Sequence, residues 1–473
     1  MKNIKKVLAV VLAMAMVMAM SLTAFAEDAA YDTGKVTISG LTDGDTLYLY
    51  KVADAEVGAD NVVNYTFASW VPAEYDTTEE ITEATDVTAM ANALAAAAKT
   101  GASAAYTVTE NGDISVDAGY YVANVEGTSA EVVYQNMLIN ATMAANSSNS
   151  YDAAAVTATI KSSSVEVDKD VTGAADDSDL TDGYKVGDYV PFTVTTAIPN
   201  YPSNSTYATF DITDTPTNLN IVNDEDHPVT VTVGGTEIEA GDTTFTLTAD
   251  GTLSVSFKKD YVLANTGAAV VVTYSAQLTD AAAVTAAGAA TNDAKVTFNP
   301  NPYVDTTNDI EDIVTVKTYG YVFDKVGKEN AALEGATFTL YSDEACTTPV
   351  TKADGTTAMT STSTIVNDKA YVYFNGLKAD TTYYVKETTA PAGYVACDNF
   401  SFSLSSETAT ADNPATTDVA ETNYLVNNTS VVNTPGAELP TTGGIGTTIF
   451  YIAGCVLVVG AGVIMITRRR MDA

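Results

Sequence analysis

The chain has 473 residues, with 60 Asp and Glu against 22 Lys and Arg, and a formal net charge of −38 at pH 7. Phosphate contacts depend on Lys and Arg, and all arginines lie together at 468–470, so this composition argues against a nucleic-acid partner. A single histidine, His227, excludes histidine metal clusters and leaves Ser-His-Asp catalysis dependent on one residue.

The first 26 residues have the three parts of a secretory signal peptide. A basic stretch at 1–6 precedes an apolar run at 7–20, and the small-x-small sequence Ala24-Phe25-Ala26 follows. This order predicts cleavage after Ala26. A retained membrane anchor is the alternative, and the acidic residues directly after Ala26 disfavour it.

Most of the chain shows the pattern of antiparallel β-sandwiches, in which short runs rich in Val, Thr, Tyr and Phe are bounded by turn residues. Examples are residues 35–39, 46–52, 191–196, 252–257, 270–274, 337–341 and 381–386. One Ala-rich segment, Asp86–Lys99, has helical spacing. We therefore predict an all-β fold of tandem Ig-like β-sandwich domains, with one short helix in the N-terminal domain.

Composition also predicts the domain boundaries. The chain becomes small and polar at 144–164 and again at 299–312, where two Asn-Pro steps occur. We expect an N-terminal domain at 27–150, a linker at 151–164, a middle domain at 165–300 and a C-terminal domain at 315–435.

The C-terminal end combines a short motif, an apolar helix and a basic tail. Residues 445–466 are about 22 apolar or small residues, enough for a transmembrane helix. The arginines that follow place the tail, 467–473, in the cytoplasm. The motif before the helix is Leu439, Pro440, Thr441, Thr442 and Gly443.

This arrangement resembles the sorting signal of Gram-positive surface proteins. The resemblance implies that a sortase attacks the Thr442–Gly443 peptide bond and joins the chain to peptidoglycan at the cell surface. Removal of both ends would leave 16 lysines against 59 acidic residues, a net charge of −43. Such a surface repels copies of itself.

Polar residues occupy inward-facing positions of predicted strands in the middle domain. Strand residues two apart share a face. Lys169 is in phase with valines at 165, 167 and 171, Asp214 with Phe210 and Ile212, and Asn292 with apolar residues at 294, 296 and 298. The C-terminal domain repeats this pattern.

In the C-terminal domain, Lys325 is in phase with aromatic residues at 321 and 323, Glu387 with Tyr383 and Val385, and Asn433 with Val431. A lone buried ammonium or carboxylate costs several kcal/mol, so these groups must be paired or neutral. Burial favours a neutral amine and a protonated carboxyl. Attack of the amine on the Asn carboxamide, with loss of ammonia, would give a Lys–Asn isopeptide bond. An ordinary buried ion pair beside an unrelated Asn is the alternative.

Three segments, 324–326, 383–394 and 431–444, resemble the C-terminal CnaB-type domain of Gram-positive pilins. In that family the corresponding Lys and Asn are joined with help from the Glu, which implies a Lys325–Asn433 bond assisted by Glu387. Four middle-domain segments, VDKDV, YKVGDYVPFTVTTAIPNY, FDITDTP and TNDAKVTFNPNP, resemble the middle domain of major fimbrial subunits and imply a Lys169–Asn292 bond assisted by Asp214.

The resemblance implies the backbone subunit of a sortase-assembled pilus, built from Cna-type domains and supporting adhesion. The subunit would be a sortase substrate rather than an enzyme and would need no cofactor or metal. Its partners would be sortase, neighbouring pilin subunits, peptidoglycan, and further minor pilins and host-surface ligands. A secreted hydrolase that uses these domains as a stalk is a weaker alternative, because no nucleophile motif supports it.

The lysine that would join subunits is Lys161. The family carries it in a WxxxVxVYPK motif, and residues 152–161 match that motif at Val156 and Lys161 but lack its Trp, Tyr and Pro. Strand phase places Lys161 on a polar face with Thr157, Thr159 and Ser163. If Lys161 is an ordinary linker lysine, the chain is a monomeric anchored adhesin or a minor pilus subunit.

The N-terminal domain is expected to lack an isopeptide bond. Its first strand places Lys35 on the face opposite Val36 and Ile38, and Asn124 stands where the C-terminal domain has its Glu.

Two cysteines of the C-terminal domain, Cys346 and Cys397, are expected to form a disulfide in a secreted chain, with two free buried thiols as the alternative. The acidic segment 176–183 lacks the spacing of a calcium-binding EF-hand loop, which favours a solvated turn.

Overall fold

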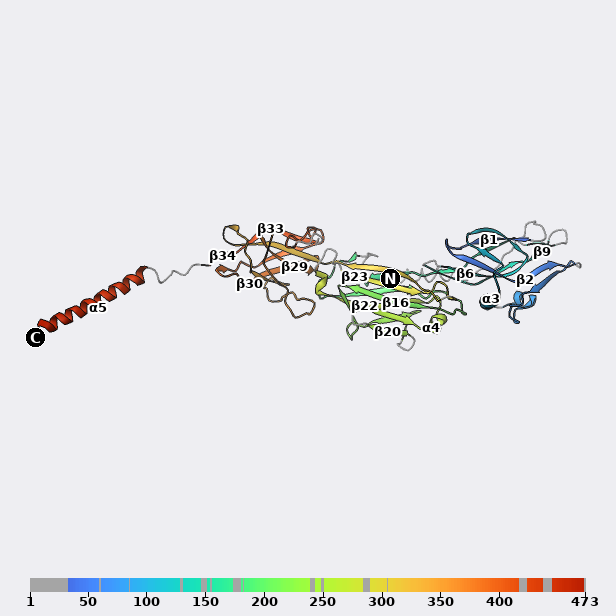
Figure 1. The fold of residues 1–473 in the computed structure, drawn as a ribbon, viewed down its shortest axis with the longest axis horizontal. Helices are drawn as coiled ribbons and strands as arrows, with labels where there is room; N and C mark the ends of the chain where they lie inside the picture. Colours follow the sequence, from blue (N-terminus) through green and yellow to red (C-terminus); the bar gives the residue numbers. More distant parts are fainter. Residues whose placement is uncertain are drawn as a thin grey trace.

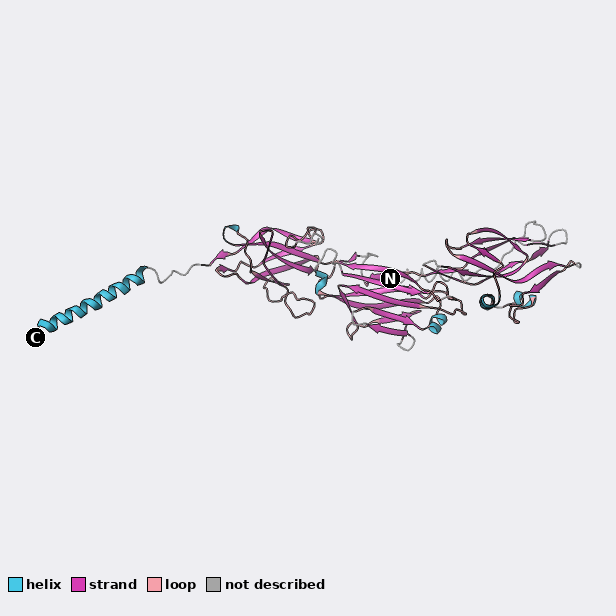
Figure 2. Ribbon diagram, in the orientation of Figure 1, coloured by secondary structure: helices cyan, strands magenta, loops and turns pink. Residues whose placement is uncertain are grey.

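A computed structural model of the chain describes most of its length as a row of β-rich units followed by a separate helix (Figure 1). The predicted signal peptide and the 439–443 motif lie outside the described residues. The structure describes residues 33–471, except for 59–60, 85, 128–130, 146–150, 154, 173–179, 182, 239–242, 248–250, 284–289, 304, 417–422 and 437–444. Strands dominate every unit and helices are few (Figure 2), which confirms the all-β fold class.

The N-terminal domain contains a five-stranded sheet, β3-β2-β6-β8 with β4 beside β2, and a three-stranded sheet, β11-β1-β5; β10 pairs with β9, and β12 with β7. Its strands are β1 (Thr33–Ser39), β2 (Thr46–Val57), β3 (Val63–Phe67), β4 (Tyr106–Val108), β5 (Gly112–Asp117), β6 (Gly119–Glu126), β7 (Val132–Tyr134), β8 (Met137–Ala141), β9 (Met143–Ala145), β10 (Tyr151–Ala153), β11 (Ala155–Thr159) and β12 (Ser162–Ser164).

The predicted helix is α3 (Val87–Gly101), whose first turn is capped because Asp86 Oδ1 accepts a hydrogen bond from the backbone N–H of Ala89 at 2.9 Å. Its apolar side packs on one face of β2 and β6, while the sheet containing β1 covers the other face. Coverage on both faces explains why β6 is buried along almost its whole length. Two short helices, α2 (Thr78–Thr82) and α4 (Lys259–Ala264), were missed by the sequence interpretation.

The middle domain is a sandwich of two six-stranded sheets, β13-β15-β22-β18-β19 with β17 beside β22, and β14-β24-β23-β16-β21-β20. One apolar core fills the space between them. Its elements are β13 (Val167–Val171), β14 (Leu180–Thr181), β15 (Tyr189–Ala197), β16 (Phe210–Thr217), β17 (Leu219–Val222), β18 (Thr230–Val233), β19 (Thr236–Glu237), β20 (Thr243–Leu247), β21 (Leu253–Phe257), β22 (Ala269–Leu278), η2 (Asp280–Ala283), β23 (Ala290–Phe298) and β24 (Asn308–Val316).

The C-terminal domain is a smaller sandwich of two four-stranded sheets, β28-β29-β25-β33 and β27-β26-β30-β32, with a separate β31-β34 pair. The first strand, β25, runs parallel to β33, one of the last. Its elements are β25 (Tyr319–Val326), η3 (Lys328–Asn330), β26 (Thr337–Tyr341), β27 (Thr360–Thr362), β28 (Thr364–Val366), β29 (Lys369–Leu377), β30 (Thr381–Thr389), β31 (Tyr394–Val395), β32 (Phe400–Leu404), β33 (Tyr424–Val432) and β34 (Thr434–Pro435).

Two segments predicted as connections contain strands instead. The expected linker 151–164 holds β10, β11 and β12, and β11 pairs with β1 of the N-terminal domain. The segment 299–312 holds most of β24, which pairs with β23, so the middle sheet extends beyond the expected end at residue 300. Small polar residues suggested loops, but pairing stabilises strands here: β11 pairs with the distant β1, and β24 with the preceding β23.

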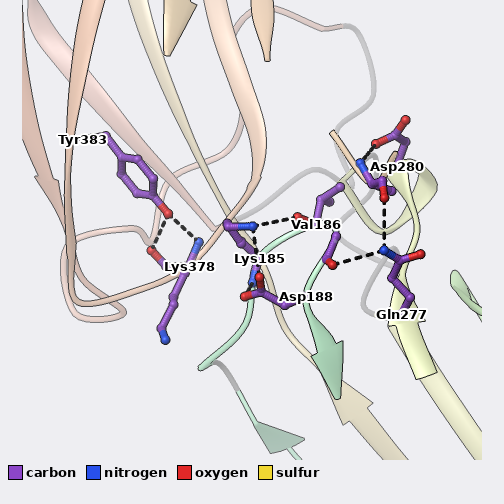
Figure 3. Close-up of polar contacts among 9 residues, drawn as sticks. Lys185, Val186, Asp188, Gln277, Asp280, Lys378 and Tyr383 are labelled. Carbon is purple, nitrogen blue, oxygen red and sulfur yellow. Dashed lines mark hydrogen bonds and ion pairs between the residues drawn. The ribbon is translucent and has the colours of Figure 1, made fainter. Parts of the chain in front are cut away.

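The middle and C-terminal domains meet through hydrogen bonds to backbone groups (Figure 3). The N–H of Val186 donates to the carbonyl of Gly376 at 2.9 Å. Gln277 Nε2 donates to the carbonyl of Ala353 at 3.0 Å, and Asp280 Oδ1 accepts from the N–H of Ala353 at 2.9 Å. In each contact the middle domain binds a backbone group of the C-terminal domain, so the contacts fix the position of that domain's backbone directly.

The N-terminal and middle domains meet through side-chain amides. Asn136 Nδ2 donates to Asn92 Oδ1 at 2.9 Å and to the hydroxyl of Tyr303, which itself donates to Asn204 Oδ1 at 3.0 Å. The Lys99 ammonium lies 4.6 Å from the centre of the Tyr303 ring. Tyr303 therefore connects several N-terminal side chains to the middle domain.

The C-terminal helix α5 (Ile445–Met471) stands apart from the sandwiches (Figure 1). Residues 448–471 are long and apolar enough to cross a membrane, and none of this stretch is buried in the protein. The helix continues through Arg468–Arg470, which were expected to belong to a separate tail.

Candidate functional site

The middle domain brings Lys169, Asp214 and Asn292 together in its core. Lys169 lies on β13 in one sheet, while Asp214 on β16 and Asn292 on β23 lie in the other. Their exposed fractions are 2%, 1% and 0%. Strand alternation therefore placed all three polar side chains correctly toward the core.

The three side chains meet at the hydroxyl of Tyr274, on β22. Lys169 Nζ pairs with the Asp214 carboxylate and donates to the Tyr274 oxygen at 2.5 Å. Tyr274 donates to Asp214 Oδ2 at 2.6 Å and accepts from Asn292 Nδ2 at 2.9 Å. Sequence reasoning missed Tyr274, although it has the inward phase of Val270 and Val272, and a buried hydroxyl usually needs a partner.

Burial shifts this cluster toward its neutral form. Desolvation lowers the pKa of Lys169, against the attraction of Asp214, and desolvation raises the pKa of Asp214, against the attraction of Lys169. Both shifts favour the neutral amine and the protonated carboxyl relative to the ion pair.

Two oxygens in the same cluster have no hydrogen-bond partner among the described residues, Asp214 Oδ1 and Asn292 Oδ1. An unsatisfied buried polar atom costs about 1–3 kcal/mol, so such atoms are rare in folded proteins. Here they belong to the Asp214 carboxyl and to the Asn292 carboxamide, the group that an amine would attack.

The C-terminal domain holds a second cluster with a different arrangement. Lys325 lies on β25, and Asn433 directly follows β33, the strand that pairs with β25. Glu387, on β30, faces them from the other sheet. Asn433 Nδ2 donates to Glu387 Oε1 at 2.7 Å, and the N–H of Cys397 donates to Glu387 Oε2 at 2.7 Å. All three predicted residues are buried.

Lys325 has only carbonyl partners among its described hydrogen bonds. Its Nζ donates to the backbone carbonyls of Val326 and Val431, each at 3.1 Å. Desolvation lowers the pKa of Lys325, against the charge of Glu387. The Asn433 Oδ1 atom is buried without a hydrogen-bond partner among the described residues, as in the middle cluster.

In each domain, a buried amine of lowered pKa thus lies in one cluster with a carboxyl group and an asparagine carboxamide. These are the reactants and the acid–base group for forming an amide bond with release of ammonia.

The disulfide expected between Cys346 and Cys397 is wrong, because both are free thiols in the structure. Cys346 lies in a turn with positive φ, and its Sγ accepts from Asn399 Nδ2 at 3.5 Å. Cys397 instead belongs to the Glu387 site. Burial, followed by the charge of Glu387, raises the pKa of its thiol to about 12.

The N-terminal domain has a different arrangement at the matching positions. Lys35 is exposed and forms an ion pair with Asp113 at 2.6 Å, while Val36 and Ile38 are buried. Asn124 is buried and its Nδ2 donates to Asn136 Oδ1 at 2.9 Å. Lys35 therefore points away from the core, as the strand phase predicted.

Lys161 lies between β11 and β12, at the joint between the N-terminal and middle domains. It is half-exposed, and its carbonyl accepts from the N–H of Gln135 at 2.9 Å. Thr157 and Thr159 are exposed as expected, but Ser163 is buried and its Oγ accepts from the N–H of Asn200 at 3.1 Å. The alternation breaks because β11 ends before Lys161.

No group of three or more His, Cys, Asp or Glu suited to a metal ion occurs among the described residues. Most of the acidic segment 176–183 lies outside them.

Two regions of the chain match known families. Residues 320–417 match the prealbumin-like fold domain, and residues 431–472 match the LPXTG cell wall anchor motif. Among curated proteins, none matches the chain.

The structure is similar to solved pilin structures. The T6 backbone pilin of serotype M6 Streptococcus pyogenes, described as a modular three-domain structure, aligns with a TM-score of 0.64 and 18% identity over 87% of this chain and 100% of that one. The full-length major pilin SpaD from Corynebacterium diphtheriae aligns with a TM-score of 0.51 and 18% identity over 88% and 100%.

The anchor motif implies sortase and the cell wall as partners. The chain is therefore a cell-wall-anchored surface protein with the fold of Gram-positive backbone pilins.

Proposed function

We propose that this chain is the backbone subunit of a covalent pilus, in which Thr442 of one subunit is joined to Lys161 of the next. The observation that carries the proposal is the three-domain backbone-pilin fold over almost the whole chain, ending in the cell wall anchor. The chain would act as a structural sortase substrate rather than an enzyme. Minor pilins and a host-surface ligand would be the further partners of such a shaft.

The charge of the mature chain supports a covalent link between subunits. With 16 lysines against 59 acidic residues, copies of the chain repel each other. Loose surface contacts would have to overcome that repulsion, whereas a peptide-type bond made by sortase does not depend on it.

We further propose that intramolecular Lys169–Asn292 and Lys325–Asn433 bonds reinforce the middle and C-terminal domains, with Asp214 and Glu387 as the acid–base groups. The buried clusters support this assignment because each contains all three reacting groups. Pulling force would then pass through covalent links rather than through the hydrogen bonds of the sheets alone.

Polymerisation can be tested in a Gram-positive host that supplies a pilus-type sortase. The wild-type chain should give a detergent-resistant ladder in the cell-wall fraction, and Lys161→Ala should give only the anchored monomer. Lys328→Ala is the matched control, because Lys328 is an exposed lysine of the C-terminal domain. A wild-type chain that stays monomeric would favour an anchored adhesin, and a ladder that persists in Lys161→Ala would assign the link to another lysine.

A further inference from the structure

The Tyr274 oxygen contacts both nitrogens that exchange protons during bond formation in the middle domain, the attacking nitrogen of Lys169 and the leaving nitrogen of Asn292. It is 2.5 Å from Lys169 Nζ, which must lose a proton, and 2.9 Å from Asn292 Nδ2, which must gain one. It also donates to Asp214 at 2.6 Å. One hydroxyl therefore touches the nucleophile, the leaving group and the acid.

The surroundings hold Tyr274 in place and keep it protonated. Its ring stacks on Phe192 with 5.6 Å between centres, and the Lys169 ammonium lies over both rings at 5.1 and 5.2 Å. Burial, followed by the charge of Asp214, raises the pKa of Tyr274 well above its ordinary value. The group stays a phenol, which can accept a proton on its oxygen while donating its own.

We propose that Tyr274 is a catalytic residue of the middle domain, relaying a proton from Lys169 Nζ to Asn292 Nδ2 during isopeptide formation. This inference rests on the proposed Lys169–Asn292 bond. It adds Tyr274 to the Lys, Asn and Asp already assigned to that bond.

The relay balances protons and electrons. Lys169 first gives one proton to Asp214, which leaves a neutral amine. The amine electron pair attacks Asn292 Cγ, the Nζ–Cγ bond forms, and the π electrons of the carbonyl move onto Oδ1. Because Asp214 Oδ2 now carries a proton, it no longer accepts from Tyr274, and the Tyr274 hydroxyl is free to turn to Nδ2. Tyr274 takes one proton from Nζ and gives its hydroxyl proton to Nδ2, so the phenol is restored. The electrons on Oδ1 re-form the C=O bond as the Cγ–Nδ2 bond breaks with its electrons on nitrogen; ammonia leaves, and Asp214 keeps the first proton.

The C-terminal cluster shows a different route. Among the described contacts, Asn433 Nδ2 donates to Glu387 itself, and Lys325 Nζ donates to backbone carbonyls. The carboxyl of Glu387 touches the leaving nitrogen directly, so a tyrosine is not needed to reach it. The two bonds should therefore respond differently to loss of the Tyr274 hydroxyl.

The test compares wild type with Tyr274→Phe in the chain 27–442 and measures the rate at which each of the two bonds forms. Chains made in a short cell-free pulse are quenched at intervals and digested, and the two cross-linked peptides are quantified by mass spectrometry. The Lys169–Asn292 bond should form about 100-fold more slowly, at the low end of the range for a lost acid–base group, while the Lys325–Asn433 bond keeps its rate. Tyr201→Phe is the matched control, a buried tyrosine whose hydroxyl binds Thr209 and Asn299 instead.

An unchanged rate of the middle bond in Tyr274→Phe would overturn the relay. Absence of the middle bond from the folded wild-type chain would instead overturn the proposed function of that cluster, so the two failures are distinguishable. If Tyr274→Phe does not fold, 3,5-difluorotyrosine at position 274 keeps the shape and the hydroxyl but changes its acidity. A rate that changes supports the relay, and a rate equal to wild type overturns it.

Discussion

The middle and C-terminal clusters contain the same three kinds of group but place them differently relative to the sheets. In the middle domain Lys169 and Asn292 lie in opposite sheets. In the C-terminal domain Lys325 lies on β25 and Asn433 directly follows β33, the neighbouring strand of the same sheet. A bond in the middle domain would tie the two layers together. A bond in the C-terminal domain would tie its first strand to the segment that leads to the anchor.

The clusters also differ in the hydrogen-bond partners of the lysine and of the acid. Lys169 pairs with Asp214 and contacts Tyr274, while Lys325 donates to two carbonyls and Glu387 is held by Asn433 and the Cys397 N–H. The comparison teaches that the same three kinds of group can be held by two different hydrogen-bond networks. It also predicts that equivalent substitutions will have unequal effects.

The largest difference is expected from removing each lysine. Lys169→Met should abolish the middle bond and cost about 4–5 kcal/mol by analogy with a disulfide that closes a long loop. It should cost about 1–3 kcal/mol more because Asp214 loses a buried partner. Lys325→Met should cost only the free energy of the missing bond, because Glu387 keeps both its hydrogen bonds.

Scanning calorimetry of the mature chain measures this difference, with Lys328→Met as the exposed control. Equal destabilisation by the two buried substitutions would contradict the difference between the networks.

The acids should act separately in the two domains. Asp214→Asn should slow the middle bond by about 100-fold or more and leave the C-terminal bond unchanged, and Glu387→Gln should do the reverse, because each acid touches only its own cluster. Quantified cross-linked peptides give both rates from one sample. Loss of both bonds in either single variant would mean that the domains depend on each other.

The smallest expected effect concerns the free thiols. A pKa raised to about 12 leaves Cys397 almost wholly protonated at pH 8, and the thiolate is the reactive form. Iodoacetamide should therefore label Cys397 about 1,000-fold more slowly than an ordinary thiol with a pKa near 8.5. Glu387→Gln removes the neighbouring negative charge and should speed this labelling.

Peptide mapping after alkylation measures the rate at each cysteine. A Cys346–Cys397 disulfide recovered from the folded chain would contradict the free thiols.

Local sequence pattern was sufficient for the orientation of the reactive residues. Strand side chains alternate with a period of two whatever the strand pairs with, so the phase of Lys169, Asp214 and Asn292 could be read without a structure. The same holds for Lys325. The alternation rule failed at Ser163, because β11 ends at Thr159 and the inward–outward alternation starts again at β12.

Features that depend on distant parts of the chain could not be read in this way. β11, in the segment 151–164, pairs with β1 from the start of the N-terminal domain, and β24 pairs with β14 from the start of the middle domain as well as with β23. The free state of Cys346 and Cys397 depends on where two loops lie. Tyr274 became part of the site only because β22 lies in the sheet that faces β16 and β23, which brings the Tyr274 hydroxyl to Asp214 and Asn292.

The sequence by itself thus determined the acidic composition, the β architecture, the membrane-length apolar helix near the C-terminus, and which polar residues face inward, because each depends on composition or local periodicity. Only the tertiary structure decided which sheets the inward groups join and which hydroxyl lies between them. Those contacts arise from strands far apart in the chain, and their register is set by packing of the whole domain.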